Sequence, residues 1–425
     1  MDDLRVLVIN GGGVRGIIPA RILQELTTIA GKEKNVTDLF DYIIGTSIGG
    51  IEAAALTIPS EDGENPKYTT KDVVDIMLND AQVIFPTKTS TLDTYSNEAI
   101  LSTTVISGMT GAGACWLYGT GKIAMLAAGV SAGLVGFTIA GLAHAYYNTN
   151  LFSAKYSRDG IDGMLEKHFG NATLSETLIP ISTVSYSLNF DAPKIWSTYK
   201  AKLNPNEDYY LKDAAGATSA APTYFPPKVT VSPSGFTHYD VDGGIFANSP
   251  TFLGITELLR NERSLDLQKL IVVSIGTGKF LKKVYDPSVN HLGGDGQIGW
   301  ISPNAHDLIG KMMKGTENVD VSEANHIFGA LRINPKLEEK FAPLDKSSPE
   351  HMKEFLEAVE NVFISDHRGM LKHVVDCLES KNVKSVSCAK ARDTLKDYAP
   401  EEHALDTMYH LLHEKFEIPL NEYNE

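Results

Sequence analysis

Two short apolar runs, each ending in a glycine-rich turn, constrain the fold of this chain more than any other feature. Val6–Ile9 leads into "NGGGVRG", and "DYII" leads into "GTSIGG" before an alanine-rich stretch. Between them, apolar residues recur at helical spacing from Pro19 to Ile29. The order strand, turn, helix, strand, turn, helix predicts a layered α/β domain with a mostly parallel sheet.

Three further strand-like runs close on turns later in the chain. They are "LIPISTVSYSLN" (178–189), "HYDVDGG" around Asp242, and "LIVVSIGTG" (270–278). The turns at Gly45, Asp242 and Gly276 all follow predicted strands, and ligands bind at that edge of an open α/β sheet. We therefore expect the functional residues at these turns.

The stretch "GTSIG", Gly45–Gly49, matches the G-x-S-x-G nucleophile elbow. Such a turn holds a serine in a strained backbone conformation, and the flanking residues must be glycine so that strand and helix can pass closely. The hydroxyl then stands exposed at the start of a helix, whose dipole favours developing negative charge. The pattern predicts Ser47 as a nucleophile, with Gly45 and Gly49 as supporting glycines.

A serine nucleophile needs a base, and the usual base is a histidine. The histidines in predicted loops lie in no distinctive motif: His238, His306 and His326. "VDGGIFANSP" instead places Asp242 at a strand end before Gly243 and Gly244, a turn that can bring a carboxylate close to another backbone. An ordinary Asp-Gly turn is the alternative interpretation.

The glycine run Gly11–Gly16 is compatible with three kinds of site. It satisfies G-x-G-x-x-G, but the second predicted strand ends in a serine elbow rather than in the acidic residue of a dinucleotide site. A Walker-type phosphate loop would need Gly-Lys-Ser/Thr, which is missing here. Backbone amides of Gly11, Gly12 and Gly13 could instead stabilise the oxyanion of an acyl transfer, an effect worth roughly 3–4 kcal/mol per donor. We favour an oxyanion hole.

Composition narrows the class of protein and its surroundings. An apolar fraction of 43% is that of a globular protein, and a net charge of −15 argues against nucleic-acid partners and against attraction to anionic lipid. Cys115, Cys377 and Cys388 are too few and too scattered for a disulfide framework or a thiolate metal site. The N-terminus lacks the basic and apolar regions of a signal peptide. We therefore expect a cytoplasmic protein in a reducing compartment.

One segment does not fit the α/β plan. Between Glu98 and Lys155 the only charged residue is Lys122, and Ile123–Ala143 gives 21 uncharged residues, long enough to span a bilayer. Its glycines and alanines recur at the small-residue spacing of packed membrane helices. The same composition would suit an insertion buried within the protein or between protomers. Both interpretations stay open.

The motifs "GGGVRG", "GTSIG" and "DGG", in that order, resemble those of the patatin-like phospholipases. "AKYSRDGIDGMLEKHFG", "DAAGATSAAPTYFPP" and "VVSIGTG" are similar to the same family, so the resemblance spans most of residues 5–335. It implies a three-layer α/β/α hydrolase with a Ser47–Asp242 dyad and no histidine. Arg15 and Gly16 would complete the glycine motif, with Arg15 holding the loop or a phosphate. The family usually has Asp where this chain has Asn10, which puts the loop's electrostatics in doubt.

The resemblance implies a lipid acyl hydrolase of the phospholipase A or lysophospholipase type, acting on fatty acyl esters of membrane phospholipids without a metal or cofactor. We expect a catalytic domain over 1–345, interrupted by the apolar insertion at about 86–153, and a helical C-terminal extension over 346–425 packed on it.

The expected partner is a phospholipid membrane, bound peripherally or conditionally. The resemblance also allows a gated effector, as among bacterial members of the family, with which we place this chain. A small molecule, a protein activator or self-assembly through the insertion would then switch it on. The alternative is a non-catalytic lipid-binding or membrane-perturbing protein on a hydrolase scaffold.

Overall fold

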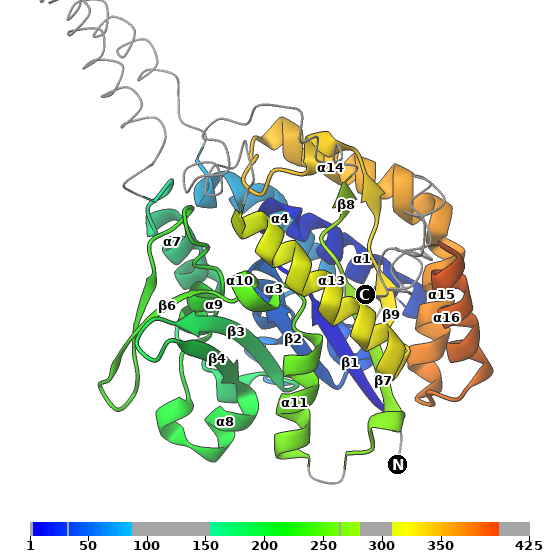
Figure 1. The fold of residues 1–425 in the computed structure, drawn as a ribbon, viewed down its shortest axis with the longest axis horizontal. Coiled ribbons are helices and arrows are strands. Elements are labelled where there is room, and N and C mark those ends of the chain that lie inside the picture. Colours follow the sequence, from blue (N-terminus) through cyan, green and yellow to red (C-terminus); the bar gives the residue numbers. More distant parts are fainter. Residues whose placement is uncertain (1–2, 32–33, 87–153, 263–264, 281–307, 399–425) are drawn as a thin grey trace, which may run out of the picture. The chain divides into compact units, whose positions relative to one another are not determined.

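A central sheet organises the chain. In the computed structural model, the described residues are 3–31, 34–86, 154–262, 265–280 and 308–398. Within them the sheet has eight strands in the order β5-β6-β3-β2-β1-β7-β9, with β4 paired to β3 (Figure 1). The strands are β1 (Leu4–Ile9), β2 (Tyr42–Thr46), β3 (Ile181–Ser187), β4 (Ala192–Ser197), β5 (Lys228–Val231), β6 (Thr237–Asp242), β7 (Leu270–Ile275) and β9 (Leu331–Ile333). The short strands β8 (Lys279–Phe280) and β10 (Lys336–Leu337) pair separately.

The sheet is parallel in its middle and antiparallel at the end formed by β5 and β6. β1 pairs in parallel with β2 on one side and with β7 on the other, while β6 runs antiparallel to both β3 and β5. The apolar run Val6–Ile9 is buried on both faces, as expected of a central parallel strand between two helical layers. The predicted mostly parallel α/β sheet is confirmed.

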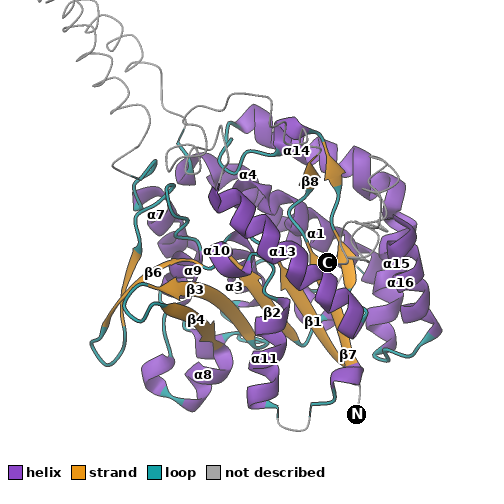
Figure 2. Cartoon of the chain, in the orientation of Figure 1, coloured by secondary structure: helices purple, strands orange, loops and turns teal. Residues whose placement is uncertain are grey.

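Helices cover both faces of the sheet (Figure 2). Val6 and Val8 of β1 pack in one apolar cluster with Leu258 of α11 (Thr251–Asn261) and Ala324 of α13 (Leu308–Phe328). The helices α1 (Ile17–Ala30), α3 (Ile48–Thr57) and α4 (Thr70–Ile84) form the layer behind the sheet in Figure 1. The remaining α-helices that the structure describes before residue 340 are α2 (Val36–Leu39), α7 (Asp159–Phe169), α8 (Thr198–Leu203), α9 (Leu211–Thr218) and α10 (Gly244–Ala247).

The C-terminal part is helical, with α14 (Pro349–Val359), a π-turn, α15 (Ser365–Ser380) and α16 (Val386–Tyr398). Ser348 caps α14 by accepting a hydrogen bond from the His351 amide, as its position before Pro349 predicts. Arg21 of α1 forms an ion pair with Glu360. These helices and the sheet belong to one compact unit.

The expectation drawn from the cysteines needs a correction. Cys377 of α15 and Cys388 of α16 form a disulfide that joins the two helices. The spacing of the cysteines did not indicate this pairing, because it depends on how the two helices pack. The argument from scattered cysteines to a reducing compartment therefore loses its support.

The predicted insertion lies outside the described residues. Among the residues that the structure describes, no helix is both long and apolar enough to cross a bilayer.

Candidate active site

Ser47 occupies a sharp turn between β2 and α3. Its φ is 56° and its ψ is −124°, a conformation that costs free energy for a residue with a side chain. A Cβ on Gly45 would overlap the carbonyl group of Gly49, and a Cβ on Gly49 would overlap the carbonyl group of Ile9. The two glycines therefore allow α3 to start directly against β1 and β2, as the elbow motif predicts.

A threonine that sequence reasoning missed fixes the backbone of this turn. The Ser47 amide donates a hydrogen bond to the hydroxyl oxygen of Thr218, with an N–O distance of 2.9 Å. The Thr218 hydroxyl in turn donates to the carbonyl oxygen of Val184 in β3. Thr218 lies in "DAAGATSAAPTYFPP", and that stretch was the only sequence signal for it.

Asp242 ends β6 beside this turn, and its carboxylate accepts a hydrogen bond from the Gly244 amide. The Ser47 side chain is near enough to this carboxylate to lower the pKa of Asp242. The Gly244 bond measures 2.7 Å. Burial raises the pKa of Asp242 to about 7, although Ser47 and the bond from Gly244 act to lower it. A Cβ on Gly243 would overlap the Val184 carbonyl, so this glycine lets the turn approach β3. The structure thus brings together Ser47 and Asp242.

The glycine loop after β1 lies against the elbow. The Gly11 amide donates to the Asn248 carbonyl at 3.1 Å, and the Gly11 carbonyl accepts from the Thr277 hydroxyl at 2.8 Å. The Gly11 amide is therefore already engaged and does not serve as an oxyanion donor in this conformation. The amides of Gly12 and Gly13 have no acceptor within the described part of the chain. These two remain as candidate donors.

Arg15 and Gly16 support the loop. The Arg15 Nε donates to the Gly12 carbonyl at 3.2 Å, and its guanidinium lies 5.3 Å from the ring centre of Phe280. Arg15 was expected to hold either the glycine loop or a phosphate, and its hydrogen bond to Gly12 is consistent with holding the loop. A Cβ on Gly16 would overlap the Ile48 side chain, so this glycine lets the chain pass close to α3.

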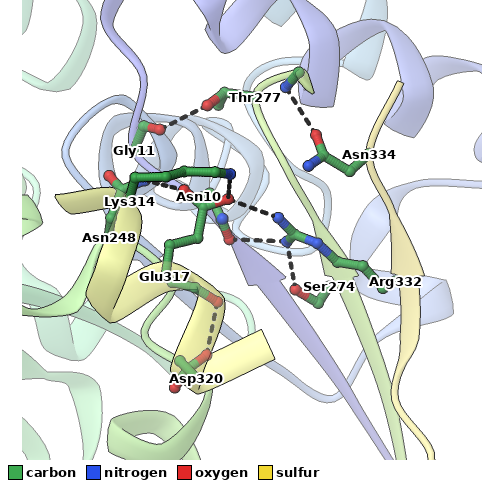
Figure 3. A network of polar contacts seen from close by, with 12 residues as sticks. Asn10, Gly11, Asn248, Ser274, Thr277, Lys314, Glu317, Asp320, Arg332 and Asn334 are labelled. Atoms are coloured by element: carbon green, nitrogen blue, oxygen red, sulfur yellow. Dashed lines mark hydrogen bonds and ion pairs between the residues drawn. The ribbon is translucent and has the colours of Figure 1, made fainter. Parts of the chain in front are cut away.

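A buried polar network lies behind the glycine loop (Figure 3). Arg332 of β9 reaches Asn10 and the Glu317 carboxylate, and Glu317 reaches the Asn248 side chain. Sequence reasoning gave no role to Glu317 or Arg332, since neither lies in a motif.

No histidine in the described part of the chain is hydrogen-bonded to Ser47. His238 Nε2 lies 3.0 Å from the Tyr209 hydroxyl, and burial together with nearby Lys194 lowers the pKa of His238 to about 4. His306 lies outside the described residues. In the described ranges, no group of three or more His, Cys, Asp or Glu side chains is arranged to hold a metal.

A shallow groove of about 580 Å³ opens between α10, α11 and α13. Its apolar lining comes from Phe246, Phe252, Val319 and Ile327. Neither Ser47 nor the glycine loop lines it, so the groove is separate from the dyad.

Comparison with known proteins gives the family. The model of the patatin-like phospholipase family matches residues 7–254, which contain the elbow, the glycine loop and Asp242. The chain belongs to this family. At the family level it is therefore a lipid acyl hydrolase.

Among its relatives are patatin-like protein 1 and patatin-like protein 2 of Arabidopsis thaliana, each 28% identical to this chain. The alignments cover 78% and 77% of this chain and 72% of each relative. A search of solved structures finds VipD from Legionella pneumophila, with 12% identity and a TM-score of 0.31 over 93% of this chain and 80% of that one. That likeness is too slight to support an argument.

Proposed function

We propose that this patatin-like protein is a hydrolase of the phospholipase A or lysophospholipase type, with Ser47 as nucleophile and Asp242 as general base. The observation that carries the proposal is the position of a strained elbow serine beside a buried carboxylate whose pKa it lowers. A strained backbone at Ser47 or a buried carboxylate at Asp242 could each serve the fold alone. Side by side, they place a hydroxyl next to a base that can deprotonate it, which is the arrangement that nucleophilic catalysis requires.

The reaction follows from these groups. The Ser47 oxygen attacks the acyl carbon of the ester while its proton passes to Asp242. The amides of Gly12 and Gly13 stabilise the oxyanion that forms on the former carbonyl oxygen. When the intermediate collapses, the proton returns to the leaving alcohol and an acyl-serine remains. Water then attacks the acyl carbon while Asp242 takes its proton, and when this second intermediate collapses the proton returns to the Ser47 oxygen and the fatty acid leaves.

Exposed apolar side chains near the edge strand β5 support membrane docking. The apolar patch is the pair Phe190 and Phe236, which are 61% and 45% exposed and whose rings stack 5.6 Å apart. A second set, Leu188, Val229, Val231 and Tyr239, is 46–60% exposed, and Val229 of β5 lies opposite Tyr239 of β6. Exposed apolar patches of this kind mark interaction surfaces. Because a net charge of −15 opposes anionic lipid, we propose that this patch docks on a zwitterionic phospholipid surface.

Fatty-acid release from mixed phospholipid vesicles tests the dyad. Wild type is expected to release fatty acid, and Ser47→Ala and Asp242→Asn are expected to release none above background. Reaction of Ser47 with a fluorophosphonate probe but no release from vesicles would favour the gated effector that needs an activator. Failure of both assays would favour the non-catalytic lipid-binding protein. Diacyl and lysophospholipid substrates compared side by side separate the two activity types.

A further inference from the structure

A buried guanidinium anchors the start of the glycine loop. Arg332 is 2% exposed, and its Nη1 donates to Asn10 Oδ1 at 3.2 Å and to the Ser274 hydroxyl at 2.8 Å. Its Nη2 lies 3.0 Å from Glu317 Oε1 (Figure 3). Asn10 directly precedes Gly11, so Arg332 ties this loop both to β7 and to α13.

Glu317 extends the same network to the turn that follows Asp242. Its Oε2 accepts a hydrogen bond from the Asn248 side chain at 2.9 Å, while the Asn248 carbonyl accepts from the Gly11 amide. The neighbouring carbonyl of Ala247 accepts from the hydroxyl of Thr46, the residue before Ser47, at 2.7 Å. One carboxylate on α13 thus connects segments that carry the glycine loop, the elbow and the Asp242 turn.

We infer that Glu317 is a positioning residue for acyl transfer, which acts through Arg332 and Asn248 to hold the Gly12 and Gly13 amides over Ser47. The inference rests on the proposed function. Oxyanion donors contribute only when their geometry is fixed before the reaction, and a misplacement of about 1 Å can cost about 100-fold in rate. Glu317 therefore affects turnover without touching the substrate.

The charge on Glu317 suits this role. Burial alone would raise its pKa, but Lys314, Arg332 and the bond from Asn248 together lower the pKa below its ordinary value. The carboxylate is therefore ionised at neutral pH and faces the buried guanidinium directly. Replacing Glu317 with glutamine removes the negative charge that faces the Arg332 guanidinium.

Asn10 provides a way to separate positioning from mere stability. Its Oδ1 accepts from the same guanidinium as Glu317, and its Nδ2 is buried without a hydrogen-bond partner among the described residues. An aspartate at position 10 would therefore place a carboxylate against Arg332 and remove the unsatisfied donor. The variant Asn10→Asp/Glu317→Gln moves the negative charge from one side of Arg332 to the other.

The experiment compares wild type, Glu317→Gln and Asn10→Asp/Glu317→Gln on a soluble short-chain ester. We expect Glu317→Gln to lower kcat by about 10- to 100-fold with KM within about twofold, because the loop moves while substrate binding is unchanged. The double variant is expected to recover most of the lost kcat. Full kcat in a folded Glu317→Gln protein, or no recovery in the double variant, would overturn the inference.

Asp41→Asn is the matched control. Asp41 pairs with the buried Arg5 at the amino end of β1, with an N–O distance of 2.7 Å, far along the strand from the glycine loop. This variant is expected to lower the melting temperature but not kcat. An equal kcat loss in Asp41→Asn and Glu317→Gln would reduce the role of Glu317 to general stability.

A second measurement does not depend on activity. Amide hydrogen exchange of Asn10, Gly11 and Val14, whose amides are hydrogen-bonded, is expected to accelerate at least tenfold in Glu317→Gln and to slow again in the double variant. If wild type neither hydrolyses the ester nor reacts with a fluorophosphonate, the proposed function fails, while this exchange pattern still decides whether Glu317 orders the loop. Unchanged exchange in Glu317→Gln would refute the ordering itself.

Discussion

The raised pKa of Asp242 predicts that replacing this carboxyl with an amide stabilises the protein while it stops the reaction. The pKa is about 7 in the folded state against an ordinary value of 3.8. A shift of about three pKa units corresponds to about 4 kcal/mol of free energy that favours the protonated form. Asp242→Asn resembles that form permanently, and its carbonyl can still accept from the Gly244 amide.

The sign of the pH dependence follows from proton binding. Between about pH 4 and pH 7 the folded protein retains the Asp242 proton that the unfolded chain has lost. The free energy of unfolding therefore falls as pH rises through this window and is constant above it, as far as this group is concerned. Asp242→Asn lacks the effect, so its stability advantage is expected to grow by about 3 kcal/mol between pH 5 and pH 8.

Urea unfolding of wild type and Asp242→Asn at pH 5 and pH 8 measures this difference. Ser47→Ala is the matched variant, because it keeps the carboxyl and removes the hydroxyl that lowers the pKa of Asp242. Its free energy of unfolding should fall between pH 5 and pH 8 by at least as much as that of wild type. Wild-type kcat/KM on a soluble ester should also rise through about pH 7, since the base must be ionised. Parallel stability of wild type and Asp242→Asn across the pH range would refute the reasoning.

Two other variants probe the elbow and the membrane patch. Gly45→Ala is expected to lose fluorophosphonate labelling and about 1–3 kcal/mol of stability, because the added Cβ overpacks the turn. Gly163→Ala on α7 is the control: its Cβ meets nothing within 4 Å, so it should stabilise the protein by about 0.5–1 kcal/mol. Wild-type labelling of Gly45→Ala would contradict the steric argument. Phe190→Ser combined with Phe236→Ser should weaken sedimentation with phosphatidylcholine vesicles at least fivefold and spare hydrolysis of a soluble ester. Leu203→Ser, which removes a 78% exposed side chain on α8, should change neither property. Equal vesicle binding by wild type, the double variant and Leu203→Ser would remove the patch from the proposal.

The sequence predicted what short motifs encode. Alternation of apolar runs with glycine turns gave the mostly parallel sheet, and local spacing placed Ser47 and Asp242 at strand ends. The structure brings the two residues close enough for Ser47 to lower the pKa of Asp242, and their catalytic role stays a prediction. The engagement of the Gly11 amide could not be predicted, because its acceptor on Asn248 comes from a distant turn.

The supporting network escaped prediction for the same reason. Arg332 is 322 residues from Asn10, and no periodicity or motif connects positions that meet only after the sheet has formed. The disulfide between Cys377 and Cys388 likewise depends on the packing of two helices. Residue type and spacing constrain a chain locally, whereas these contacts are set by tertiary packing.

The place of β1 in the sheet has a consequence for when the protein becomes active during synthesis. β1 pairs with β2 at Tyr42 but also with β7 at Leu270, and ribosomes add about 5–20 residues per second. The elbow serine is therefore made tens of seconds before β7, and Arg332 emerges later still. In the proposed mechanism, a nascent chain that ends before β6 has Ser47 but lacks Asp242, and one that ends before β9 lacks Arg332. We therefore expect lipid hydrolysis only after β9 has been made.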